Sequence, residues 1–321
     1  MENSFKKRIN YEGKIEDISM QICKDYRLGE FKSNKLILTG YEDFNFKLET
    51  EDNKYLVKIF ANFRNLEDCK RYVNVLGKTI EAGIATPKLY KSEQGYLHIM
   101  NINETNLRLC VMEYINGKTI YELKQKLTSD EIRFLSQQAA LINSIKIKPK
   151  LFYDSWAITN FSKEFEKKSN YLSSEDKNML EPIVDKFREL KIENLPHCFV
   201  HGDIITTNII RDKNNKLWLI DFSVSNYYPR IQELAVLACN LLFDENSKKN
   251  TERNLNIVLE EYQKSISLTK EELDSLPLYT KLAHAMYILG ASFSKNAKGN
   301  TSEENKYWLN QGRAGLKQML K

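Results

Sequence analysis

The amino-acid sequence predicts an α+β protein in which a small, sheet-rich lobe precedes a larger, mainly helical lobe. Between residues 36 and 60 apolar residues alternate with polar ones, which is typical of antiparallel strands joined by short turns. Beyond residue 118 helical periodicity dominates, and from residue 229 onward it is the only pattern that we find. A chain of 321 residues is long enough for two lobes. We therefore expect a first lobe at residues 1–112 and a second lobe at residues 113–321.

The first lobe begins with a helix and continues with strands. Ile15, Ile18 and Ile22 recur at helical spacing, and Gly29 marks the end of that pattern. A second helix is expected over residues 66–80, because apolar residues again recur at helical spacing before a glycine. The strand-like segments of this lobe are, in order, residues 36–38, 44–48, 54–60, 96–100 and 107–114.

The second lobe is helical apart from three short strands. Thr128 and Glu131 form a capping box, which predicts the start of a helix that carries Ile132 and Leu135. The strand-like segments lie at residues 198–200, 208–210 and 217–220. The last two flank a turn-forming segment and predict a hairpin.

Composition and charge exclude several classes of protein. The net charge is only +5, from 48 Lys and Arg against 43 Asp and Glu, which does not indicate a nucleic-acid partner. The five cysteines are widely spaced without a Cys-x-x-Cys pair, so neither a disulfide scaffold nor a structural zinc site is expected. The N-terminal residues lack the apolar segment of a signal peptide, and the best apolar stretch, residues 234–243, is too short to span a bilayer. We expect a reduced, soluble, cytoplasmic protein without a membrane partner, and the oligomeric state stays open.

One segment carries the groups that phosphoryl transfer requires. His201-Gly202-Asp203-x4-Asn208 follows a short apolar strand, and Asp221 ends the predicted hairpin. A loop carboxylate can orient a hydroxyl group and accept its proton, while an amide oxygen and a second carboxylate can share Mg²⁺, a cation that takes oxygen ligands. The metal neutralises the charge of a triphosphate while the acceptor is held in line. The pattern predicts Asp203 as the base and Asn208 and Asp221 as metal ligands.

This motif, together with Asp221-Phe222, resembles that of the aminoglycoside phosphotransferase superfamily, which includes choline, ethanolamine and homoserine kinases and spore-coat kinase-like proteins. The resemblance extends over residues 36–293 and is sharpest from residue 200 to residue 235. It implies a two-lobed protein-kinase-like fold with ATP and Mg²⁺ as cofactors. The activity that it implies is transfer of the γ-phosphate of ATP to a hydroxyl group of a small molecule.

The sequence departs from the superfamily pattern at a few positions. Thr206-Thr207 replaces a Pro-Gly-like pair, and Ser223 replaces the usual residue after Asp-Phe. Glu233 stands where relatives carry an Asp that helps to hold the catalytic loop. None of these changes removes one of the expected ligands.

The resemblance also assigns roles in the first lobe. Lys58 matches the strand lysine that contacts nucleotide phosphates, and Glu67 on the following helix is the best match to its carboxylate partner. Gly40 and Asn45 belong to the loop that covers the phosphates. The hinge that offers backbone groups to adenine is expected at Glu113 and Ile115.

Each of these assignments has a plainer alternative. His201 is expected to brace the loop through hydrogen bonds rather than to take part in the chemistry. Lys58 could be an exposed strand lysine, and Glu67 could pair with Arg71 on the helix surface. The segment between Asp221 and Glu233 is too short for the regulatory segment of a protein kinase.

The sequence does not identify the molecule that accepts the phosphate. An amino alcohol, a sugar or an aminoglycoside-like molecule all stay open, and an antibiotic-resistance phosphotransferase is one alternative. The other is a catalytically silent protein, either a spore-coat protein with this fold or a nucleotide-binding scaffold. The presence of all three expected catalytic groups, Asp203, Asn208 and Asp221, argues against a catalytically silent protein.

Overall fold

The computed structural model describes residues 6–37 and 43–320, and its internal contacts divide the chain into two compact units. Unit 1 comprises Met1–Gly117 and Ile210–Ile220, and unit 2 comprises Lys118–Ile209 and Asp221–Lys321. The sequence places the boundary at residues 112/113, whereas the contacts place it after Gly117. They also assign the hairpin Ile210–Ile220 to unit 1, where the backbone N–H of Leu219 donates to the carbonyl oxygen of Ala85 over 2.7 Å.

Unit 1 is built on an antiparallel sheet. Its strands follow the order β1-β2-β3-β6-β4, and β5 pairs with β6. The strands are β1 (Phe31–Ile37), β2 (Phe44–Thr50), β3 (Lys54–Ile59), β4 (Leu89–Tyr90), β5 (His98–Ile102) and β6 (Thr105–Glu113). The described part of this unit also contains the helices α2 (Ile15–Tyr26) and α3 (Leu66–Glu81). The α+β class predicted from the sequence is confirmed.

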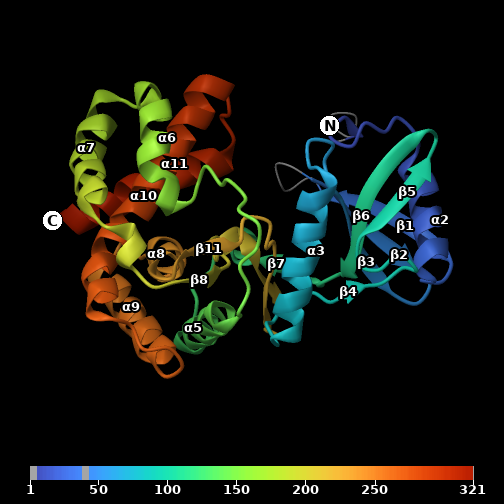
Figure 1. Cartoon of the computed structure of the whole chain (residues 1–321), viewed down its shortest axis with the longest axis horizontal. Coiled ribbons are helices and arrows are strands. Elements are labelled where there is room, and N and C mark those ends of the chain that lie inside the picture. The colour runs from blue at the N-terminus through green and yellow to red at the C-terminus, as the bar shows by residue number, and fades with distance from the viewer. Residues whose placement is uncertain (1–5, 38–42, 321) are drawn as a thin grey trace. The chain divides into compact units, whose positions relative to one another are not determined.

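The two helices cover opposite faces of this sheet (Figure 1). Successive side chains of a strand point to opposite faces, and the α2 face carries the apolar core, which includes Phe46, Val57 and Leu109. The other face carries Lys58 of β3, with Asn45 of β2 as its cross-strand neighbour. Because cross-strand neighbours share a face, Asn45 and Lys58 lie side by side on the α3 side of the sheet.

A second, smaller sheet has the strand order β10-β9-β7. Its strands are β7 (Gly117–Thr119), β9 (Ile209–Asp212) and β10 (Leu217–Leu219). Gly117 approaches β9 so closely that a Cβ at this position would stand 2.4 Å from the carbonyl oxygen of Arg211. Only glycine fits this contact without a shift of backbone.

Unit 2 is mainly helical, and its long helix α10 packs against α7, α8 and α11. The capping box predicted at Thr128 is present and begins α5. A two-stranded antiparallel sheet joins β8 (His197–Val200) to β11 (Asn226–Pro229). The helices are α4 (Ile120–Leu123), α5 (Ser129–Ser144), α6 (Phe161–Lys168), α7 (Ser174–Glu189), α8 (Ile231–Cys239), α9 (Lys248–Gln263), α10 (Lys270–Lys298) and α11 (Glu303–Leu320), with short 3₁₀ turns at Ile158–Asn160, Ser169–Tyr171, Ile192–Asn194 and Thr206–Asn208. Within the described ranges no helix is long and apolar enough to cross a membrane.

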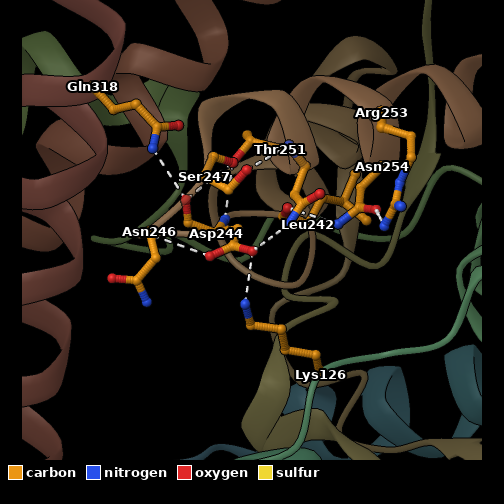
Figure 2. Close-up of polar contacts among 10 residues, drawn as sticks. Lys126, Leu242, Asp244, Asn246, Ser247, Thr251, Arg253, Asn254 and Gln318 are labelled. Carbon is orange, nitrogen blue, oxygen red and sulfur yellow. Dashed lines mark hydrogen bonds and ion pairs between the residues drawn. The ribbon is translucent and has the colours of Figure 1, made fainter.

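The loop between α8 and α9 is tied down by one buried carboxylate, Asp244 (Figure 2). Its side chain accepts hydrogen bonds from the Lys126 ammonium at 2.7 Å, the Asn250 amide at 3.0 Å and the Asn246 backbone N–H at 3.1 Å. Its carbonyl oxygen accepts from Gln318 of α11 at 3.0 Å. Asp244 thus connects α9, α11 and the segment after α4.

Candidate active site

The segment that follows β8 is held in place by Glu233 of α8. The Glu233 side chain is fully buried and accepts hydrogen bonds from the backbone N–H groups of His201, at 2.9 Å, and Gly202, at 2.8 Å. Gly202 has a φ of +83°, a left-handed conformation that favours glycine. The polypeptide therefore turns sharply before Asp203, and the backbone N–H groups of His201 and Gly202 both have a hydrogen-bond partner in this turn.

His201 braces this turn. The Nδ1 atom of its buried side chain accepts a hydrogen bond from the Asp203 backbone N–H at 3.2 Å. Its ring lies against that of Phe222, with centroids 4.3 Å apart. His201 thereby links the loop that carries Asp203 to the segment that carries Asp221.

Asn208 fixes the carboxyl group of Asp203. Its Nδ2 donates to the Asp203 side chain at 2.7 Å and to the Asp203 carbonyl oxygen at 3.0 Å. Among the described residues no hydrogen bond reaches the Asn208 Oδ1. The amide therefore turns its donor side to Asp203 and leaves its acceptor oxygen for a cation, which is the orientation that a metal ligand requires.

The electrostatic environment of Asp203 is unusual for a carboxyl group. Burial raises the pKa of Asp203 to about 8, and the negative charges of Asp154 and Asp221 add to the rise, against the Asn208 hydrogen bond that lowers it. Glu233 contributes further to the rise. A site with this concentration of carboxyl groups favours a positively charged ligand.

Asp221 stands in a strained backbone conformation, with a φ of 63°. Its Oδ1 accepts a hydrogen bond from the Ser223 backbone N–H at 3.3 Å, and the residue is exposed. In the described ranges no three His, Cys, Asp or Glu side chains converge on one metal position. This donor set fits Mg²⁺, which is usually held by one or two protein carboxylates and completed by phosphate oxygens and water.

In unit 1 the structure corrects one expected pairing. Lys58 is buried, and its Nζ forms an ion pair with Asp43 at 3.1 Å. Glu67, the expected partner, is exposed and pairs with Lys70 at 3.0 Å instead. The first turn of α3 directs Glu67 toward solvent, away from the sheet. Gly40 lies outside the described residues.

The other expected nucleotide contacts show unused polar groups. The Asn45 side-chain oxygen is buried and has no hydrogen-bond partner among the described residues. The N–H of Ile115 is likewise unpaired within the described chain, as a hinge donor should be. The N–H of Glu113 is engaged, because it donates to the Lys88 carbonyl oxygen at 2.9 Å.

The sequence pattern does not indicate the contacts of two carboxylates, Asp43 in unit 1 and Asp154 in unit 2. Asp43 stands two positions before Asn45, but no spacing rule connects it to Lys58. Asp154 lies in an irregular segment outside any motif, and only the fold brings its charge near Asp203.

The chain is similar in sequence and in fold to known phosphotransferases. Residues 34–262 match the model of a family described as "Phosphotransferase enzyme family". A homoserine kinase of Zymomonas mobilis is 22% identical over 266 residues, which cover 81% of this chain and 81% of that protein. The structure of an amicoumacin kinase in complex with AMP-PNP, Ca²⁺ and Ami superposes with a TM-score of 0.69 at 17% identity, over 98% of this chain and 96% of that one. A choline kinase from Streptococcus pneumoniae gives a TM-score of 0.62 at 15% identity, over 94% of this chain and 98% of that one.

Proposed function

Since the chain belongs to the phosphotransferase enzyme family and is a small-molecule kinase, we propose that it transfers the γ-phosphate of ATP to the hydroxyl group of an amino alcohol. The observation that carries this proposal is the half-buried carboxyl of Asp203, which is fixed by Asn208 and lies near further carboxyl groups. ADP and a phosphomonoester are the products.

Asp203 orients the acceptor hydroxyl and takes its proton as the oxygen–phosphorus bond forms. Asn208, through the amide oxygen that no described residue engages, and Asp221 would hold Mg²⁺. When bound, the cation neutralises charge on the triphosphate. Glu233 and His201 keep Asp203 in place, so that catalysis rests mainly on positioning.

Lys58 contacts the phosphates of ATP from the sheet of unit 1. Its neighbour Asn45 supplies a buried oxygen that accepts no hydrogen bond from residues 6–37 or 43–320. Ile115 offers its N–H, which no acceptor in the described part of the chain engages, to the adenine ring. These three groups support ATP as the phosphate donor.

The acceptor class follows from the charge of the site. Asp154 is nearly buried, and its negative charge acts on Asp203. An acceptor that places its hydroxyl at Asp203 therefore gains from carrying an ammonium group next to that hydroxyl. The homoserine and choline kinases similar to this chain act on acceptors of this kind, and we place homoserine first among the candidates.

A matched pair of acceptors tests this assignment. We expect turnover with homoserine and with small amino alcohols such as ethanolamine and choline. 4-Hydroxybutanoate, which is homoserine without its amino group, should be phosphorylated poorly. ATP consumption is measured for each compound with Mg²⁺, beside a panel of sugars and aminoglycosides. Turnover with sugars alone would contradict the amino-alcohol class, and ATP binding without turnover on any acceptor would favour a silent scaffold.

Substitution of the base tests the chemistry. Asp203→Asn preserves the shape of the side chain and removes its basicity, so ATP affinity should stay unchanged while kcat falls by about 10²–10⁴-fold. The measurement is kcat and the dissociation constant of ATP for both proteins. An Asn variant with undiminished kcat would show that Asp203 is not the base.

A further inference from the structure

We propose that Asp43, rather than a carboxylate of the following helix, is the positioning residue that holds Lys58 for phosphate binding. The inference rests on the proposed function, in which Lys58 contacts the phosphates of ATP. It names a residue that the resemblance to kinases does not supply.

The geometry of Asp43 is that of a fully engaged carboxylate. One oxygen contacts the Lys58 Nζ at 3.1 Å, and the other accepts from the Arg64 Nε at 2.8 Å and from the Ala61 backbone N–H at 3.1 Å. The Asp43 side chain is 3% exposed, and the side chains of Lys58 and Arg64 are 8% and 5% exposed. Little freedom is left to the Lys58 ammonium in this arrangement.

Helix α3 offers Lys58 no carboxylate, although it carries three. Glu67 pairs with Lys70 at 3.0 Å, and Glu81 pairs with Lys78 at 2.7 Å, both on the surface. Asp68 accepts from the Asn65 backbone N–H at 3.3 Å as part of the N-terminal capping box.

What α3 presents to Lys58 is the ring of Tyr72. The Lys58 Nζ lies 5.0 Å from the centroid of that ring. A cation at this distance is attracted by the ring face, but the ring supplies no countercharge. The countercharge comes from Asp43, whose segment directly precedes β2.

The charges of this cluster favour an anionic ligand. Burial alone raises the pKa of Asp43, but the positive charges of Lys58 and Arg64 outweigh it and hold the pKa below its usual value. Asp43 therefore stays ionised. The positive charges of Lys58 and Arg64 lie together beside Asp43, and such a group of cations can attract a phosphate group.

The position of Asp43 in the chain gives this contact a second consequence. Asp43 stands two residues before Asn45, on the segment that the resemblance assigns to the phosphate-covering loop. Asn45 is in turn the cross-strand neighbour of Lys58. One short segment therefore supplies both the residue that holds the lysine and a polar group beside it.

The experiment compares two carboxylates of similar size, each converted to its amide. Asp43→Asn should weaken the binding of Mg-ATP by about 10- to 100-fold, because a charge-assisted hydrogen bond is lost. Glu67→Gln should leave the affinity unchanged, like the matched control Glu81→Gln on the same helix. Dissociation constants are measured by calorimetry on the full chain.

Two further readouts separate positioning from a loss of structure. Adenosine lacks phosphates, so its affinity should be equal in the wild type and in Asp43→Asn. In a Lys58→Met background, Asp43→Asn should have no further effect on ATP affinity, since the two residues act through one contact. A general loosening of the unit would lower adenosine affinity as well, and that result would overturn the inference.

The outcomes also distinguish this inference from the proposed function. If the wild type binds ATP and Glu67→Gln weakens that binding while Asp43→Asn does not, the positioning role of Asp43 is wrong and the kinase assignment stands. If the wild type binds no ATP, both proposals fail. Should Asp43→Asn not fold, Glu67→Gln still decides, because retained affinity supports Asp43 and lost affinity overturns it.

Discussion

At the scale of single residues, Glu233 shows how one side chain sets the geometry of a catalytic loop. Relatives are expected to carry an Asp here, and the longer Glu still reaches both the His201 and the Gly202 N–H groups. Burial raises the pKa of Glu233 to about 7, while these two hydrogen bonds lower it. The His201 N–H is buried with the carboxyl group and the Gly202 N–H is partly buried, so both depend on Glu233 for a partner.

The substitution Glu233→Gln should therefore reduce both stability and turnover. The amide can accept one hydrogen bond, but its NH₂ group then faces the second backbone donor, and an unsatisfied buried group costs about 1–3 kcal/mol. Urea unfolding and kcat measure the two effects. Glu260→Gln on the exposed face of α9 is the control and should change neither quantity. Normal stability and turnover in Glu233→Gln would show that the loop does not depend on this carboxyl group.

A sequence motif indicates the functional residues themselves better than it indicates their partners. Asp203, Asn208 and Asp221 share a fixed spacing on one continuous segment, and the structure brings the first two into contact. The pairing of Lys58 with Glu67 was wrong, because spacing along a helix does not decide which way its first turn points. Asp43 belongs to the segment predicted to cover the phosphates, but its pairing with Lys58 is not predicted, because only the fold of the sheet brings the two together.

At the scale of elements, the length of a helix or strand decides whether its sequence pattern predicts it. Helices α2, α3 and α5 were predicted close to their observed bounds, because each repeats its apolar positions over several turns. Strands β4, β7 and β11 were not predicted. They are two to four residues long, too short for an alternating pattern, and their pairing depends on neighbours that are distant in the sequence.

The packing of α10 against α11 gives a prediction at this scale. A Cβ on Gly315 would stand 2.0 Å from the His284 ring, so Gly315→Ala forces the two helices apart and should destabilise the protein by about 1–3 kcal/mol. Gly77→Ala on α3 is the matched control, because a Cβ there meets nothing within 4 Å. Alanine favours a helix, so this control should be stabilising by about 0.5–1 kcal/mol. Thermal unfolding of both variants checks the contrast, and equal shifts would contradict it.

At the scale of the whole molecule, the order of segments in the sequence does not fully determine the division into units. The sequence analysis assigns residues 113–321 to one lobe, but Ile210–Ile220 packs within unit 1. The hairpin itself was predicted from its turn. The membership of this hairpin in unit 1 could not be predicted, because it depends on a hydrogen bond to Ala85, a residue more than a hundred positions earlier.

The free energy of unfolding of the whole chain should depend on pH through one buried histidine. His284 of α10 is 2% exposed, and its Nδ1 lies 3.3 Å from the Cys239 Sγ. Burial lowers the pKa of His284 to about 3, whereas a histidine in an unfolded chain has a pKa of about 6.5. Below pH 6.5 His284 therefore binds a proton in the unfolded state but stays neutral in the folded state.

Stability must then fall as the pH is lowered from about 6.5 toward 3, with a slope of up to about 1.4 kcal/mol per pH unit from this residue. Above pH 6.5 the residue is neutral in both states and adds no slope. Other groups also titrate in this range, so the test compares wild type with His284→Asn, which keeps a polar side chain but cannot titrate. The variant should be less stable at pH 7, because it packs less well, and the difference should shrink at pH 6, 5 and 4 in urea unfolding. Parallel curves for the two proteins would mean that His284 can take up a proton without unfolding the chain.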